Sequence, residues 1–118
     1  MLNLNNLMIG TSDVKKLAAF YQKVFNKKTE WEGEGMYVWK VGESFFTVGE
    51  HSEVKGKSKD GPRIMFCFDT KEVEKEFKRI KELGAEVIKE PYEMGGGMIA
   101  TLADPDGNYF QLVTPWEE

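Results

Sequence analysis

Side chains that could carry out chemistry are few in this chain, and they are scattered. Its 118 residues include one histidine, His51, and one cysteine, Cys67. His51 lies close to the acidic residues Glu50 and Glu53, a setting typical of a solvated histidine rather than a metal ligand. No histidine is expected beside Cys67, so the sequence favours an inert buried thiol over a nucleophile. A catalytic zinc ion, which usually takes three protein ligands, is therefore not expected.

Two aspartates near the end of the chain could form a pair of carboxylates, but their context is that of a turn. Residues 104–108 read Asp-Pro-Asp-Gly-Asn, which combines turn-starting residues with residues that tolerate a positive φ. The strand that follows carries one polar side chain, Gln111, between apolar neighbours. Residues 95–97 are all glycine and lack the Lys-Ser/Thr of a phosphate loop, so they predict a hairpin turn or a flexible rim.

The composition is that of an ordinary globular domain with an acidic balance. The formal net charge is −4 and the pI is about 5.2, so nucleic acid and anionic membranes are poor default partners. No apolar run approaches the roughly 20 residues of a membrane span, and no signal peptide is readable. One cysteine excludes an internal disulfide and suits a reducing compartment. We therefore expect a cytoplasmic protein with a single domain at residues 1–118.

The spacing of apolar residues predicts the same series of elements twice. The first series is a strand at residues 4–10, an amphipathic helix at 12–26, and strands at 29–31, 36–41 and 44–50. The polar, lysine-rich residues 51–61 predict a surface linker. The second series is a strand at residues 63–68, a helix at 73–83 capped by Asp69-Thr70, and strands at 85–89, 98–102 and 109–114.

We interpret this repetition as an internal duplication, the alternative being a coincidence between two amphipathic helices. Placing Asp13 on Asp69 aligns three apolar pairs of the helices: Leu17 with Val73, Tyr21 with Phe77, and Val24 with Ile80. The predicted fold is α+β. It consists of two tandem βαβββ modules, at residues 1–50 and 62–118, joined by the linker at 51–61. One helix is expected on the outer face of each mixed sheet, and the other faces are expected to line a cleft.

Alternation along the strands predicts which side chains reach that cleft. In the first strand, Leu7 and Ile9 would face the helix and leave Asn6 and Met8 on the other side. In the matching strand, Ile64, Phe66 and Phe68 would face the helix and leave Arg63, Met65 and Cys67. In the last strand, Phe110 and Leu112 would face the helix and leave Tyr109 and Gln111.

In this order, the motifs resemble the vicinal oxygen chelate superfamily, which includes glyoxalase I, the bleomycin-resistance binding proteins and the extradiol dioxygenases. The resemblance rests on residues 12–14 with 20–25, on residues 82–87, and on residues 103–112. It implies a site in which His and Glu side chains hold a divalent metal. By resemblance, the ligand positions fall on Asn6, Thr47, Arg63 and Gln111. Asn, Gln and Thr are weak neutral donors and Arg has no lone pair, so we predict no metal and no other cofactor.

A cleft without a metal is still suited to binding. Its predicted lining combines apolar and polar side chains: Asn6, Met8, Trp39, Thr47, Arg63, Met65, Met98, Tyr109 and Gln111. Arg63 is the predicted anchor for an anion or carboxylate. The alternative is that Arg63 points to solvent and that the methionines and aromatic residues belong to the core.

Three functions stay open. The sequence favours a metal-independent small-molecule binding protein. The alternatives are a lyase, isomerase or dioxygenase-type enzyme that uses the same cleft, with or without a divalent metal, and an interaction module that has lost the cleft. The resemblance also implies a homodimer, and a two-fold dimer is the commonest assembly.

Overall fold

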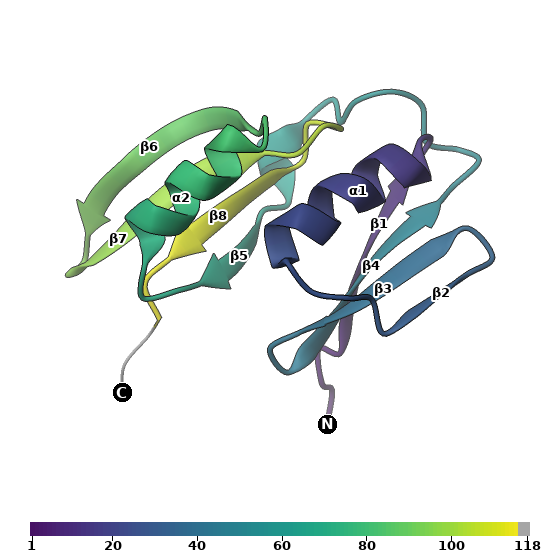
Figure 1. The fold of residues 1–118 in the computed structure, drawn as a ribbon, viewed down its shortest axis with the longest axis horizontal. Coiled ribbons are helices and arrows are strands. Elements are labelled where there is room, and N and C mark those ends of the chain that lie inside the picture. Colours follow the sequence, from purple (N-terminus) through teal and green to yellow (C-terminus); the bar gives the residue numbers. More distant parts are fainter. Residues whose placement is uncertain (116–118) are drawn as a thin grey trace. The chain divides into compact units, whose positions relative to one another are not determined.

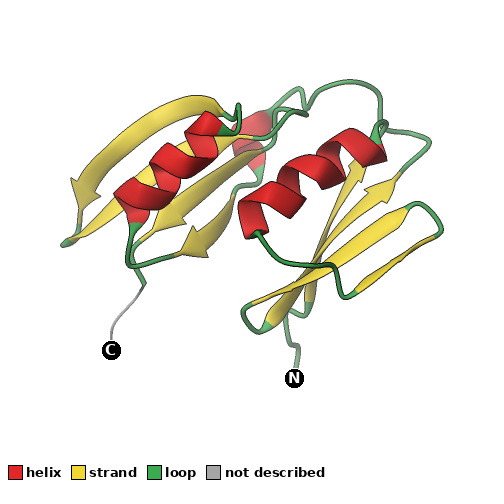
Figure 2. Ribbon diagram, in the orientation of Figure 1, coloured by secondary structure: helices red, strands yellow, loops and turns green. Residues whose placement is uncertain are grey.

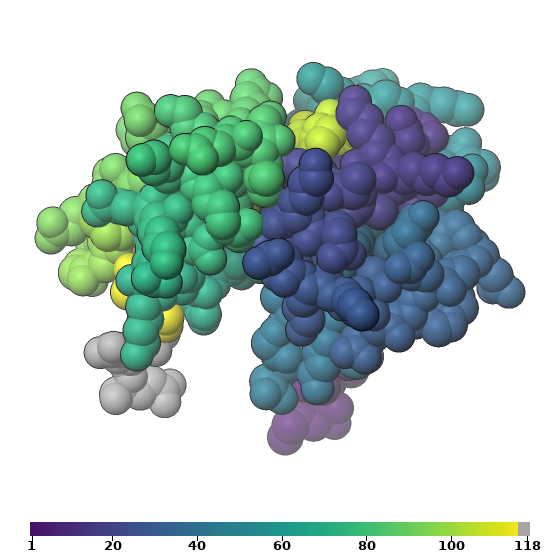
Figure 3. Space-filling view, in the orientation of Figure 1, coloured from purple at the N-terminus to yellow at the C-terminus, as the bar shows by residue number. Residues whose placement is uncertain are grey.

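The computed structural model describes residues 1–115, and the chain divides into two compact units, Met1–Gly56 and Lys57–Glu118. Each unit has one main helix and a four-stranded mixed sheet, in the order β-α-β-β-β (Figure 1, Figure 2). The prediction of an α+β fold with two βαβββ modules is confirmed. In the space-filling view, side chains of α1 form part of the surface of unit 1 (Figure 3).

Unit 1 has the strand order β1-β4-β3-β2. Its elements are β1 (Asn6–Thr11), α1 (Val14–Phe25), β2 (Trp31–Gly33), β3 (Met36–Val41) and β4 (Ser44–Glu50). β1 runs parallel to β4, and the other neighbouring strands are antiparallel. The predicted bounds of β3 and β4 are confirmed, since Gly42, with φ 61°, provides the tight turn between them.

Helix α1 forms where the sequence supplies both ends and an apolar face. The Asp13 side chain accepts a hydrogen bond from the Lys16 amide at 3.2 Å and caps the first turn, and Asn26 ends the helix in the left-handed conformation. The buried Tyr21 packs against Phe25, at a ring-centroid distance of 5.6 Å, and against Phe46 of β4, at 4.7 Å. These ring contacts fix which face of the sheet the helix covers.

Unit 2 has the strand order β5-β8-β7-β6. Its elements are a 3₁₀ turn at Gly61–Arg63, β5 (Phe66–Asp69), α2 (Val73–Glu82), β6 (Glu86–Met94), β7 (Gly97–Ala103) and β8 (Tyr109–Val113). β5 and β8 are parallel, and the other pairs are antiparallel. Phe77 and Ile80 of α2 and Phe110 and Leu112 of β8 are buried in the core of this unit.

The register shows that the two units are related by a shift of 59 residues, not by the predicted alignment of Asp13 with Asp69. α1 begins at Val14 and α2 begins at Val73. The hydroxyls of Thr11 and Thr70 each accept a hydrogen bond, at 3.1 Å, from the amide two residues further on. The predicted cap at Asp69-Thr70 is therefore wrong in part: Asp69 belongs to β5, and Glu72 occupies the N-cap without a side-chain cap bond.

Two strand boundaries also differ from the prediction. The strand expected from Arg63 begins only at Phe66, because Pro62 lies at the start of a 3₁₀ turn that includes Arg63. The strand expected to end at Lys89 continues through Pro91 to Met94. A proline is tolerated there because β6 is an edge strand. No helix within residues 1–115 is long and apolar enough to cross a membrane.

Candidate functional site

Each sheet has one face covered by its helix and one face turned away from it, which we call the open face. In unit 1, Phe46 and Trp39 lie on the helix side, since both rings contact Phe25 of α1. Alternation and register then assign the open face of unit 1, whose main side chains are Asn6, Met8, Trp31, Met36, Val38 and Thr47. Asn6, Met8 and Thr47 are therefore on the predicted face.

Asn6 and Thr47 form a hydrogen-bonded pair across the parallel strands β1 and β4. The Thr47 hydroxyl donates to Asn6 Oδ1 at 2.9 Å, and Thr47 is buried. The Asn6 amide nitrogen has no hydrogen-bond partner among the described residues. The pair therefore offers a free amide donor at the sheet surface and carries no charge.

Two glycines allow large apolar side chains to lie against the open face of unit 1. A Cβ at Gly33 would be 3.0 Å from the Trp31 ring, so this indole lies over the glycine. A Cβ at Gly49 would be 2.5 Å from the terminal methyl of Met8. Trp31 is nevertheless 48% exposed and Met8 50% exposed, so both side chains present apolar surface outward. Trp31 was not among the predicted site residues, although its two-residue spacing from Gly33 places both on one face.

In unit 2, the open face carries a second chain of neutral polar groups. The thiol of Cys67 donates to Gln111 Oε1 at 3.4 Å, and Gln111 Nε2 donates to Thr101 Oγ1 at 3.2 Å. Cys67 is exposed as a residue, but partial burial raises the pKa of its thiol. Tyr109 lies on the same face, two residues before Gln111. Gln111 is thus on the predicted face, and Thr101 is a neighbour that the strand pattern did not reveal.

The turn before β8 holds these residues in place. The buried carboxylate of Asp104 accepts hydrogen bonds from the amide of Asp106, at 2.9 Å, and from the amide of Asn108, at 3.0 Å. It also accepts from the Asn108 side chain at 3.0 Å. Gly107 completes the turn with φ 80°. These contacts give Asp104 the role of a turn residue, as its sequence context indicates.

Trp39 and Met98 do not lie on the open faces, and their prediction as cleft residues is wrong. Trp39 pairs with Phe46 and is fully buried, with its Nε1 donating to Gln22 of α1 at 3.2 Å. Met98 is two residues before Ala100, which pairs with the helix-facing Leu112, and it lines a hollow with Phe77 of α2. Both side chains were expected on the open face of their sheet, and both lie on the helix side.

Arg63 and Met65 are placed outside the strand that was predicted to contain them. Arg63 lies in the 3₁₀ turn, is largely exposed, and forms an ion pair with Asp60 at 3.0 Å. Met65 precedes β5 and is 41% exposed. Ile64 is 69% exposed rather than facing the helix. The parallel register places Cys67, not Arg63 or Met65, opposite Gln111.

A divalent metal does not fit the side chains at the four family positions. Asn6, Thr47 and Gln111 are neutral and hydrogen-bonded within the sheets, and Arg63 is a cation paired with a carboxylate. Hard and borderline cations prefer carboxylate or imidazole ligands. Across residues 1–115, no group of three or more His, Cys, Asp or Glu side chains could hold a metal ion.

Comparison with known proteins gives a family match over nearly the whole chain. The sequence profile of the Glyoxalase/Bleomycin resistance protein/Dioxygenase superfamily matches residues 3–112. The metallothiol transferase FosB of Bacillus licheniformis is 25% identical over 117 residues, which are 97% of this chain and 76% of FosB.

Solved structures agree with this match. A glyoxalase/bleomycin resistance protein/dioxygenase family enzyme from Burkholderia phytofirmans PsJN is 28% identical, with a TM-score of 0.78 over 96% of this chain and 98% of that one. The fosfomycin resistance protein FosX of Listeria monocytogenes is 21% identical, with a TM-score of 0.76 over 98% of this chain and 95% of that one. At this identity, the likeness to FosX concerns the fold alone.

Proposed function

Because this chain belongs to the Glyoxalase/Bleomycin resistance protein/Dioxygenase superfamily, we propose that it binds a small organic molecule on the open face of a sheet, without a resident metal ion. The observation that carries this proposal is the chemistry of the polar groups there. The hydrogen-bonded polar side chains there, Asn6–Thr47 and Cys67–Gln111–Thr101, are all neutral. Such groups orient a ligand by hydrogen bonds but do not replace the carboxylate and imidazole ligands of a metal.

The open face of unit 1 indicates the ligand's chemical character. Trp31 and Met8 present exposed apolar surface, and Met8 has a flexible thioether that adapts to irregular shapes. The Asn6 amide nitrogen is a free donor on the same face. A planar, largely apolar molecule with one or more hydrogen-bond acceptors fits this combination.

A second candidate function is catalysis, supported by the similarity to FosB, which is by name a metallothiol transferase. This candidate predicts product formation from the bound molecule. Because the side chains at the four family positions do not fit a metal, catalysis would also require either a metal held by other residues or a reaction that proceeds without a metal. The binding proposal predicts saturable binding and unchanged ligand.

We also propose a homodimer, on the strength of the family resemblance and the prevalence of two-fold assemblies. Light scattering coupled to size-exclusion chromatography measures this directly. A dimer would have twice the 13.5 kDa mass of the chain, and a mass of one chain at micromolar concentration would refute it.

The binding proposal is tested by screening a library of aromatic and heteroaromatic compounds for thermal stabilisation in the presence of EDTA. Hits are then titrated against the variants Trp31→Ala and Asn6→Ala, with Glu43→Ala, in the exposed turn between β3 and β4, as the matched control. We expect EDTA to leave affinity unchanged and both open-face variants to weaken it at least fivefold. Binding that requires an added divalent metal would contradict the proposal.

A further inference from the structure

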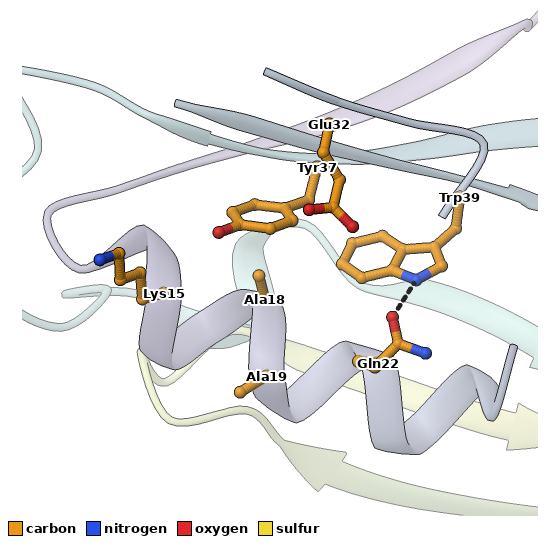
Figure 4. A pocket seen from close by; sticks show the side chains of 7 residues that line it. All are labelled: Lys15, Ala18, Ala19, Gln22, Glu32, Tyr37 and Trp39. Carbon is orange, nitrogen blue, oxygen red and sulfur yellow. Dashed lines mark hydrogen bonds between the residues drawn. The ribbon is translucent and has the colours of Figure 1, made fainter. Parts of the chain in front are cut away.

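A concave surface lies on the helix side of unit 1, between α1 and the strands β2 and β3 (Figure 4). It is a hollow of about 210 Å³, and its helix wall is formed by Lys15, Ala18, Ala19 and Gln22. The open face is on the other side of the same sheet. The hollow is therefore separate from the site proposed above.

The internal duplication provides a comparison for this hollow. The 59-residue shift carries the four helix positions onto Glu74, Phe77, Lys78 and Lys81, and these four residues line a hollow of about 570 Å³ at the equivalent place in unit 2. Both βαβββ modules of this chain thus have a hollow at this position, but its chemistry differs between the units. Unit 1 has two alanines where unit 2 has Phe77 and Lys78.

The strand wall of the hollow in unit 1 is aromatic and is held by hydrogen bonds. The rings of Tyr37 and Trp39 stack with centroids 6.4 Å apart and planes at 21°. Trp39 is fully buried, and its indole donates to Gln22 Oε1 at 3.2 Å, so the ring that stacks with Tyr37 is held in place. The Gln22 side-chain nitrogen donates in turn to the Lys27 carbonyl. This wall is therefore preorganised.

Three polar groups at the hollow are left for a ligand. Glu32 Oε2 accepts from the Thr29 hydroxyl at 2.7 Å, which orients the carboxylate and leaves Oε1 open. Among the residues that the structure describes, the Lys15 ammonium forms no ion pair and the Tyr37 hydroxyl no hydrogen bond. Figure 4 shows Lys15 on the hydroxyl side of Tyr37, and in this view the Glu32 carboxylate lies between the rings of Tyr37 and Trp39. One cation, one anion and one phenol thus surround an aromatic surface.

We propose that this hollow binds a small zwitterion of the amino-acid class. Its ammonium group would donate to Glu32, its carboxylate would accept from Lys15 and the Tyr37 hydroxyl, and its apolar body would lie against the Tyr37 ring and Ala19. Both ion pairs are charge-assisted, and an ammonium near the Tyr37 ring gains a cation–π contact. A volume of 210 Å³ equals about seven water molecules at roughly 30 Å³ each, which suits a molecule of this size.

The test is a titration of the ¹⁵N-labelled protein, followed by the indole N–H resonances of Trp39 and Trp31. The probes are the natural amino acids, each compared with the matching amine that lacks the carboxylate and the matching acid that lacks the amine. We expect a saturable shift of the Trp39 indole at millimolar or lower concentration for at least one amino acid. We also expect weaker binding of its amine and acid partners by tenfold or more. A probe that moves only the Trp31 indole would bind the open face and leave the hollow unoccupied.

Variants assign the contacts. Glu32→Gln and Lys15→Met should each weaken the amino acid by at least tenfold, the loss typical of one charge-assisted hydrogen bond. Glu30→Gln and Lys16→Met, exposed neighbours that do not line the hollow, should stay within twofold. Circular dichroism confirms that each variant is folded. The proposal is overturned if no amino acid gives a saturable Trp39 shift, if amines or acids bind as well as the zwitterion, or if Glu32→Gln and Lys15→Met bind normally.

Discussion

Replacing Asp104 with alanine should destabilise unit 2, because one buried carboxylate organises the whole turn before β8. Three donors converge on it: the amides of Asp106 and Asn108 and the side-chain amide of Asn108, at 2.9–3.0 Å. A hydrogen bond to a charged group is worth about 1.5–3 kcal/mol. Water would replace part of this at a half-buried turn, so we expect a net loss of about 3 kcal/mol in the free energy of unfolding. The midpoint of thermal unfolding should then fall by roughly 10 °C or more.

The assay is urea-induced unfolding followed by far-UV circular dichroism, with Asp104→Asn and Asp69→Ala measured in parallel. Asparagine keeps an acceptor oxygen but loses the charge, so its loss should be intermediate. Asp69 is exposed, and its carboxylate makes no hydrogen bond or ion pair within the described residues, so its replacement should cost less than about 0.5 kcal/mol. The reasoning is refuted if Asp104→Ala costs no more than Asp69→Ala.

Three further predictions follow from the packing and the thiol. Trp39→Ala should lose about 3–5 kcal/mol of stability, since it leaves a cavity at a fully buried site. Trp31→Ala, at a half-exposed site, should lose less than about 1 kcal/mol. Equal losses in chemical denaturation would contradict the assignment of Trp39 to the helix side and Trp31 to the open face. Gly61→Ala should be destabilising by about 1–3 kcal/mol, because the new Cβ would lie 2.5 Å from the Gly107 carbonyl oxygen. A Cβ at Gly49 would also lie 2.5 Å from another atom, but that atom is the flexible end of Met8, which can move away. Thermal unfolding that ranked Gly49→Ala as less stable than Gly61→Ala would contradict this account. The raised pKa of Cys67 should make its alkylation at neutral pH slower than that of free cysteine. Because the folded state favours the neutral thiol, its contribution to the free energy of unfolding is complete below the thiol pKa of the unfolded chain. That contribution is lost as the pH rises through the higher thiol pKa of the folded protein. Unfolding of a Cys67→Ser variant should not show this loss at high pH.

The fold could be predicted from the sequence where local signals were unambiguous. Glycines bounded β3 and β4, and Asp13 marked the start of α1, so these elements lie where the sequence indicates. The entry to β5 was missed because Arg63 to Phe68 alternates like a strand, whereas Pro62 starts a 3₁₀ turn. The extent of β6 was underestimated because a proline can lie within a strand only at an edge, and strand order is not visible in the sequence.

The candidate site was predictable only where a strand's face was fixed by neighbouring residues. Asn6, Met8 and Gln111 alternate with helix-facing residues of their own strands, so the face on which each side chain lies could be predicted. Trp39 could be assigned only through its pairing with Phe46, and Met98 only through Ala100 and Leu112. A one-residue change of register moves every side chain to the other face. For this reason two apolar residues that looked suitable for a binding site proved to lie on the helix side.

The central claim, binding without a metal, is tested most directly by native mass spectrometry of the purified protein, with elemental analysis of the same sample. Protein purified without chelator and then incubated with Zn²⁺, Mn²⁺ or Mg²⁺ should retain no stoichiometric metal after buffer exchange. It should still bind the best ligand from the library with the same affinity. One divalent metal per chain, retained through exchange and required for ligand binding, would contradict the account.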